Sequence, residues 1–96
     1  MAKGYWITFY RSISNESALA EYGKLARPAI EAGGGKFLVR GVSAKTYEEG
    51  LKQRVVVIEF ESLAKAVETF EGPAYQAALK HLAGAAVRDI RFVEGA

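Results

Sequence analysis

The chain has 96 residues, half of them apolar and a quarter charged, so we expect one globular domain over residues 1–96. Thirteen Lys and Arg residues against eleven Asp and Glu residues give a formal net charge of +2, and the basic residues are scattered. This distribution lacks the basic stripe of nucleic-acid-binding proteins, so no nucleic-acid partner is expected. The sequence has no cysteine, which excludes disulfides, thiolate catalysis and cysteine-ligated metals.

The hydropathy pattern favours a cytoplasmic protein with no membrane partner. The N-terminal residues run straight into a strand pattern and lack the basic-then-apolar layout of a signal peptide. No apolar run approaches the roughly 20 residues that a membrane-spanning helix needs.

The first predicted strand covers residues 4–10, which are rich in aromatic and β-branched side chains. A helix should follow, because Ser14 or Asn15 can cap its first turn and apolar residues then recur on one helical face. Pro28 lies within this pattern and predicts a kink or a split, since proline removes a backbone donor and clashes with the preceding turn. Three consecutive glycines, residues 33–35, should end the helix.

The middle of the chain predicts two further strands, at residues 36–42 and 54–60, joined by a polar connection over residues 43–52. The second of these strands is an almost continuous apolar run, which is typical of a central strand covered on both faces.

The last third of the chain predicts a helix in two pieces and a final strand. Ser62 caps the first piece, and the apolar residues after it show clear helical spacing. Gly72 breaks this helix, and Pro73 can begin the second piece because its missing donor costs nothing in the first turn. Residues 89–94 form the last predicted strand. The order βαββαβ predicts an α+β, ferredoxin-like domain, a four-stranded antiparallel sheet with helices on one face.

Both faces of this sheet carry apolar side chains, which suggests a dimer. The first strand places Tyr5, Ile7 and Phe9 on one face and Trp6, Thr8 and Tyr10 on the other, and the strand at 54–60 places Val55 and Val57 opposite Val56, Ile58 and Phe60. The face away from the helices therefore needs a cover, and a second copy related by a two-fold axis is the economical one. The alternative is an unusually large exposed apolar patch on a monomer.

Five segments along nearly the whole chain carry a family resemblance: Gly4-Tyr5-Trp6-Ile7, Gly34-Gly35-Lys36-Phe37-Leu38-Val39-Arg40-Gly41, Val57-Ile58-Glu59-Phe60-Glu61-Ser62-Leu63, Tyr75-Gln76-Ala77-Ala78-Leu79 and Val93-Glu94-Gly95. In this order they resemble the bacterial domain-of-unknown-function 1330 family of the dimeric α/β-barrel superfamily. The resemblance implies a ferredoxin-like protomer that forms a homodimer through its sheet face. It implies no activity, because that family has no established function.

Glu59 and Arg40 are the polar residues that the strand pattern singles out. A carboxylate near the end of a central strand must be hydrogen-bonded, paired or protonated, because unpaired burial costs several kcal/mol. Arg40 ends the strand expected beside it and can bridge either to Glu59 or to an anionic ligand. A structural ion pair that sets strand register is the alternative for both residues.

The other candidates are one histidine and several aromatic residues. His81, the only histidine, can act as a general base or, as a minor option, as an axial haem ligand; otherwise it is a partly exposed helix residue. One histidine cannot form a multi-histidine site, so neither a metal nor a cofactor is expected. Tyr75 follows the helix break and is expected at a pocket wall, with Tyr10 and Trp6 as further ligand-binding residues.

Two functions remain open from the sequence. The first is a pocket between sheet and helices that binds a small anionic or aromatic molecule. It includes a cofactor-free enzyme with Glu59, Arg40 and His81 as candidate catalytic residues, because proteins related by the resemblance include monooxygenases and isomerases of small aromatic substrates. The second is a non-catalytic structural or regulatory dimer module, in which Arg40 and Glu59 bridge each other. The sequence names no substrate, reaction or pathway.

Overall fold

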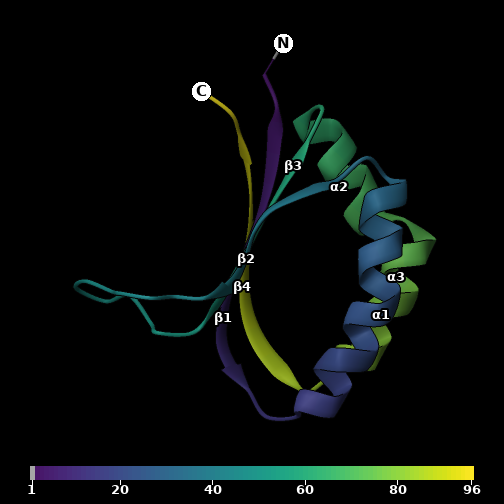
Figure 1. The fold of residues 1–96 in the computed structure, drawn as a ribbon. Helices are drawn as coiled ribbons and strands as arrows, with labels where there is room; N and C mark the ends of the chain where they lie inside the picture. The colour runs from purple at the N-terminus through teal and green to yellow at the C-terminus, as the bar shows by residue number, and fades with distance from the viewer. Residues whose placement is uncertain (1) are drawn as a thin grey trace.

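The computed structural model describes residues 2–96, and its strands form one four-stranded antiparallel sheet in the order β2-β3-β1-β4 (Figure 1). The elements are β1 (Gly4–Ile13), α1 (Glu16–Ala32), β2 (Lys36–Val42), β3 (Arg54–Phe60), α2 (Leu63–Glu71), α3 (Pro73–Leu79), a 3₁₀ turn η1 (Lys80–Leu82) and β4 (Ala86–Glu94). All the helices lie on one face of the sheet. The predicted α+β, ferredoxin-like class is confirmed.

Helix α1 is continuous, so of the kink or split expected at Pro28 the split is wrong. The Asn15 side chain caps its start by accepting a hydrogen bond from the backbone N–H of Ala18 at 3.0 Å. Pro28 is exposed, so the carbonyl that loses its helical partner faces water. Ala26 and Ile30, on either side of the proline, are buried in the core and hold both halves of the helix against the sheet.

The C-terminal end of β1 and the N-terminal end of β4 extend further than the sequence pattern predicts. Strand β1 continues to Ile13 and β4 begins at Ala86, because these two segments pair with each other beyond a β-bulge near Ser12. The extension brings Arg88 into the sheet, directly opposite Tyr10.

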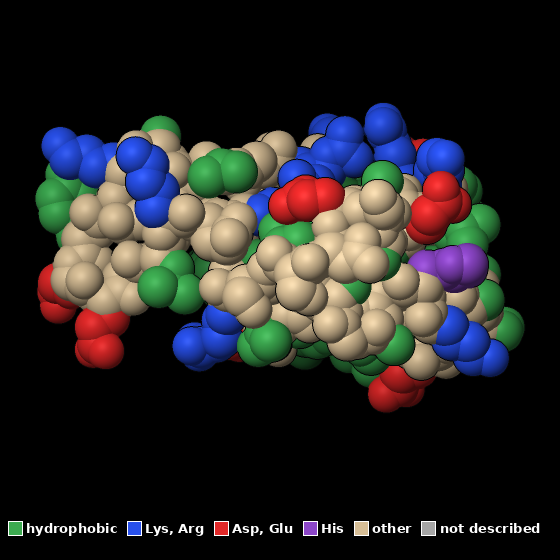
Figure 2. Space-filling view, turned by 90° about the horizontal axis from the view of Figure 1, so that it is seen from below, with side chains coloured by type: hydrophobic (Ala, Val, Ile, Leu, Met, Phe, Trp, Pro, Cys, Tyr) green, Lys and Arg blue, Asp and Glu red, His purple; other side chains and the backbone are tan. Residues whose placement is uncertain are grey.

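The connection between β2 and β3 projects away from the body of the molecule and carries both acidic and basic side chains (Figures 1 and 2). Its most exposed large hydrophobic side chain is Tyr47, at 73%. None of the helices within residues 2–96 is both long and apolar enough to cross a membrane.

The two faces of the sheet differ in how they are covered. The face toward the helices carries Trp6, Thr8, Tyr10, Val56, Ile58 and Phe60, all buried. The opposite face, which we call the outer face, carries Tyr5, Ile7, Phe9, Val39, Val55, Val57 and Val93, all partly or well exposed. The outer face also carries four charged residues: Lys36, Glu59, Asp89 and Arg91. Both faces therefore carry apolar side chains, as predicted, and the outer face is mixed.

An aromatic cluster fills one end of the layer between sheet and helices. Trp6 is its centre, and the ring centroids of its neighbours lie 4.7–6.3 Å away: Phe60, Phe70, Tyr75 and Phe92. Edge-to-face and offset arrangements of this kind stabilise aromatic pairs beyond the area they bury. We call this end of the layer the solid end.

Candidate functional site

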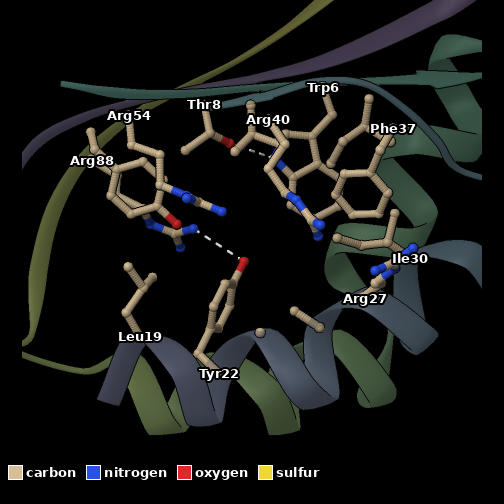
Figure 3. A pocket seen from close by; sticks show the side chains of 15 residues that line it. Trp6, Thr8, Leu19, Tyr22, Arg27, Ile30, Phe37, Arg40, Arg54 and Arg88 are labelled. Carbon is tan, nitrogen blue, oxygen red and sulfur yellow. Dashed lines mark hydrogen bonds between the residues drawn. The ribbon is translucent and has the colours of Figure 1, made fainter. Parts of the chain in front are cut away.

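The other end of the layer contains a cavity of about 80 Å³ between the sheet and α1 (Figure 3). We call it the hollow end. The sheet contributes Thr8, Tyr10 and Val56 to its wall, and α1 contributes Tyr22 and Ala26. Four arginines also line the cavity, and no Asp or Glu does: Arg27, Arg40, Arg54 and Arg88.

Arg88 is held beside two phenols. Its guanidinium donates hydrogen bonds to the hydroxyl oxygens of Tyr22 at 3.2 Å and Tyr75 at 3.4 Å, and these two oxygens lie 2.7 Å apart. The same guanidinium stands over the rings of Tyr10 and Tyr22, with 5.7 and 5.3 Å to their centroids. Arg88 is therefore fixed from three sides and keeps donors free toward the cavity.

The hydroxyls of Tyr22 and Tyr75 carry two protons, and the hydrogen bond between them uses only one. Each oxygen accepts from Arg88, and one hydroxyl donates to the other. Tyr75 is 1% exposed and does not line the cavity, whereas Tyr22 does. If Tyr75 donates to Tyr22, the Tyr22 proton points to the cavity, where within residues 2–96 it has no acceptor. The site then offers a hydroxyl donor beside a guanidinium.

The environment keeps Tyr22 neutral and Arg88 charged. Burial raises the pKa of Tyr22 far above its usual range, the nearby Tyr75 hydroxyl adds to this, and Arg88 only partly opposes it. Burial on its own would lower the pKa of Arg88, but the oxygens of Tyr75 and Tyr22 outweigh that effect and raise it. The pair therefore presents one positive charge and one neutral donor at physiological pH.

Arg54 and Arg40 add two further cations to the cavity. The Arg54 guanidinium lies 6.0 Å from the centroid of the Tyr10 ring, and that of Arg40 lies 5.6 Å from the centroid of the Phe37 ring. Within residues 2–96 neither of them pairs with a carboxylate, and Arg88 does not either. The fourth arginine, Arg27, differs because its Nε lies 3.4 Å from a Glu31 oxygen.

The expected bridge between Arg40 and Glu59 is wrong, because the two side chains lie on opposite faces of the sheet. Glu59 is on the outer face, where it accepts a hydrogen bond of 3.1 Å from the Tyr5 hydroxyl. Arg40 lies opposite Val56 on the cavity side. The cause is a bulge at Leu38, since one extra residue reverses the face of every side chain that follows.

The remaining sequence candidates divide between the cavity and the surface. Trp6 and Tyr10 line the cavity, although the Trp6 indole N–H already donates to the Thr8 hydroxyl at 3.1 Å. Tyr75 does not line the cavity, and it reaches the cavity wall only through its hydrogen bond with Tyr22. His81 is exposed on η1 and does not line the cavity. Their roles toward a ligand stay predictions.

The sequence interpretation does not include two residues of this site, Arg54 and Arg88. It counts Tyr22 among the aromatic residues that can line a pocket, though not among the candidate ligand-binding residues, and it assigns Arg54 only to the start of a strand. Arg88 precedes the residues predicted as the last strand, but it shares the alternation of Ile90 and Phe92, which was the available signal.

Comparisons with known proteins agree with this fold. A family model described as "Domain of unknown function (DUF1330)" matches residues 3–96. A protein of unknown function from Rhodopseudomonas palustris is 26% identical, with a TM-score of 0.68 over 97% of this chain and 80% of that chain. No curated protein matches the chain.

Two more distant structures share the architecture. A dimeric protein of unknown function with a ferredoxin-like fold, from Bacteroides fragilis, is 19% identical, with a TM-score of 0.54 over 97% of this chain and 95% of that chain. A protein provisionally assigned as an antibiotic biosynthesis monooxygenase, from Nitrosomonas europaea, is 13% identical, with a TM-score of 0.59 over 97% and 89%. At these identities the likeness extends to the fold alone.

Proposed function

The chain belongs to the DUF1330 family, and we propose that it binds a small organic anion in the cavity between the sheet and α1. The observation that carries the proposal is the group of guanidinium ions of Arg40, Arg54 and Arg88. They surround one cavity and have no carboxylate partner within residues 2–96.

Arg54 and Arg88 are partly buried and Arg40 is exposed, so the first two have lost part of their contact with water. A carboxylate that enters the cavity accepts charge-assisted hydrogen bonds, each worth roughly 1.5–3 kcal/mol. The Tyr22 hydroxyl is a further donor when Tyr75 donates to it. The residues of the empty cavity are therefore complementary to an anion.

The charges of the cavity separate the two ligand classes left open by the sequence. Four arginines and no Asp or Glu line it, so the anionic class fits better than the aromatic one. Among the candidate catalytic residues Glu59, Arg40 and His81, only Arg40 lines the cavity, so the proposal is one of binding.

The only tryptophan gives a direct test, because Trp6 lines the cavity. Titration with butyrate or succinate should change its fluorescence and saturate. In Arg88→Gln the affinity should fall at least about tenfold, which corresponds to the loss of one charged hydrogen bond. The control Lys80→Gln removes one exposed charge outside the cavity and should bind like the wild type. Absence of saturable binding, or equal affinities of Arg88→Gln and the wild type, would refute the proposal and favour a dimer module without a ligand.

We also propose that the outer face packs against the outer face of a second copy, which makes the protein a homodimer. This face exposes Phe9, Val39 and Val93 at 40–48% in the isolated chain. The dimeric protein from Bacteroides fragilis shows that this fold occurs as a dimer. That the protein is cytoplasmic and that residues 1–96 form one domain stay predictions.

Sedimentation velocity tests the dimer. Phe9→Glu places a charge in the middle of the outer face and should shift the protein to the monomer. Leu25→Glu is the matched control, because Leu25 is similarly exposed, at 46%, but lies on α1. A monomeric wild type, or the same shift in both variants, would refute pairing through the outer face.

A further inference from the structure

We infer that the natural ligand is a short dicarboxylate, with one carboxylate near Arg54 and Arg88 and the other near Arg40. This inference rests on the proposed function, which requires only that the cavity binds an organic anion. It adds the charge of the ligand and the length of its carbon chain.

The cations form two centres that face each other across the cavity. Arg88 and Arg54 both stand over the Tyr10 ring, and the Tyr22 hydroxyl lies beside them. Arg40 enters from β2 and points into the cavity from the side of Phe37 (Figure 3). The space between the two centres is the cavity itself.

The sheet register sets the spacing of these centres. Arg40 lies opposite Val56, and Arg54 is two residues before Val56 on the same strand, so the two arginines are a diagonal cross-strand pair. Backbone positions in such a pair are about 7–8 Å apart. A single carboxylate held bidentately by the Arg54 centre leaves Arg40 unpaired. A chain of about four carbons allows a second carboxylate to reach it.

The charge count favours two negative charges on the ligand. Arg40, Arg54 and Arg88 contribute three positive charges, and Arg27 is already paired with Glu31. Arg54 and Arg88 can share one carboxylate, so a monoanion bound to them would leave Arg40 without a partner. The second carboxylate of a dicarboxylate can pair with Arg40.

Part of the cavity wall is apolar, which favours a carbon chain over an inorganic anion. Val56, Ile58, Ala26 and Ile30 are among the residues that line the cavity. A phosphate ion there would turn oxygens toward side chains that cannot donate hydrogen bonds, at a desolvation cost. Methylene groups pack against the same side chains favourably.

Isothermal titration with succinate, butyrate and inorganic phosphate tests the inference, because the two acids have equal chain length and differ in charge. We expect the wild type to bind succinate at least about tenfold more tightly than butyrate, and phosphate more weakly than succinate. In Arg40→Gln this preference should fall below about twofold, because succinate loses more affinity than butyrate does. Lys36→Gln is the control, because Lys36 is on the same strand but does not line the cavity, and it should keep the full preference.

The outcomes separate the two proposals. Equal affinities for butyrate and succinate in the wild type would overturn the dicarboxylate while leaving anion binding intact. Tighter binding of phosphate than of succinate would overturn the inference that the ligand has a carbon chain. A preference for succinate that survives in Arg40→Gln would overturn the second centre. No binding of any of the three anions would overturn both the inference and the proposed function.

Discussion

The two ends of the layer between sheet and helices are built from the same strands but filled in different ways. At one end Trp6 on β1 packs among four aromatic rings. At the other end Tyr10, on the same face of the same strand, borders a cavity lined by arginines. Packing explains the first end, because its aromatic rings are buried or partly buried against one another. It does not explain the second.

The difference indicates where stability and function lie in this molecule. Buried aromatic residues at the solid end supply contacts that any folded chain of this class needs. Three guanidinium ions at the hollow end have no carboxylate partner within residues 2–96. Charged groups that converge on a pocket are typical of a binding site. The following predictions test this division of roles.

The largest effect is expected from a truncation at the solid end. Phe60 is 1% exposed and stacks on Trp6. Phe60→Ala should lower the free energy of unfolding by about 3–5 kcal/mol, because it removes buried apolar area and leaves a cavity. Urea unfolding at a fixed protein concentration measures this, and Phe60→Leu provides a milder variant if the alanine variant does not fold. A loss below about 1 kcal/mol would show that the cluster is not the stabilising end.

A ligand should stabilise the hollow end by an amount of similar order. Succinate at 100 times its dissociation constant should raise the free energy of unfolding of the wild type by about 2.7 kcal/mol. If Arg88→Gln binds tenfold more weakly, the same concentration should stabilise it by only about 1.4 kcal/mol. Each gain is measured against the same protein without succinate, because Arg88→Gln also loses the hydrogen bonds to Tyr22 and Tyr75 and should be less stable from the start. Equal stabilisation of both would contradict the role of Arg88.

The same glycine substitution should have opposite effects at the two ends. A Cβ on Gly4 would overlap the backbone of Leu63 at the start of α2, so Gly4→Ala should destabilise by about 1–3 kcal/mol. A Cβ on Gly23 would meet nothing within 4 Å, because this residue of α1 borders the cavity. Gly23→Ala should stabilise by up to about 1 kcal/mol through helix propensity. Thermal unfolding compares them, and destabilisation by both would argue against open space at Gly23.

The smallest effect concerns stability at alkaline pH. The pKa of Tyr22 is raised by burial, so the folded state holds this proton more tightly than the unfolded state does. The resulting stability is fully present below about pH 10, the unfolded value, and is lost as the pH rises toward the folded pKa. This group alone should cost about 1.4 kcal/mol per pH unit in that range. Tyr22→Phe should show a correspondingly shallower loss between pH 10 and 11, and an unchanged slope would contradict a buried, neutral Tyr22.

The sequence predicted the strands at residues 36–42 and 54–60 with the bounds observed, because their apolar runs and flanking breaks are local signals. It underestimated β1 and β4 at the ends where they pair with each other, since that extension depends on a contact between distant segments. The helix predicted to split at Pro28 is continuous because core contacts on both sides outweigh one lost backbone hydrogen bond.

The candidate site was less predictable than the fold. Arg40 was identified, but with Glu59 as its expected neighbour, because regular alternation without a bulge would put both on one face. The bulge at Leu38 leaves no clear mark in the local sequence, and it decides that Arg40 lines the cavity. Arg54 and Arg88 come together only through the order of the strands, in which β1 separates β3 from β4.

A crystal structure determined with succinate tests the central claim most directly, because it shows where the anion lies. The account predicts one carboxylate within hydrogen-bonding distance of Arg88, Arg54 and the Tyr22 hydroxyl, and the other beside Arg40. A cavity that holds no succinate at saturating concentration, or arginines that pair with carboxylates of the protein itself, would contradict it.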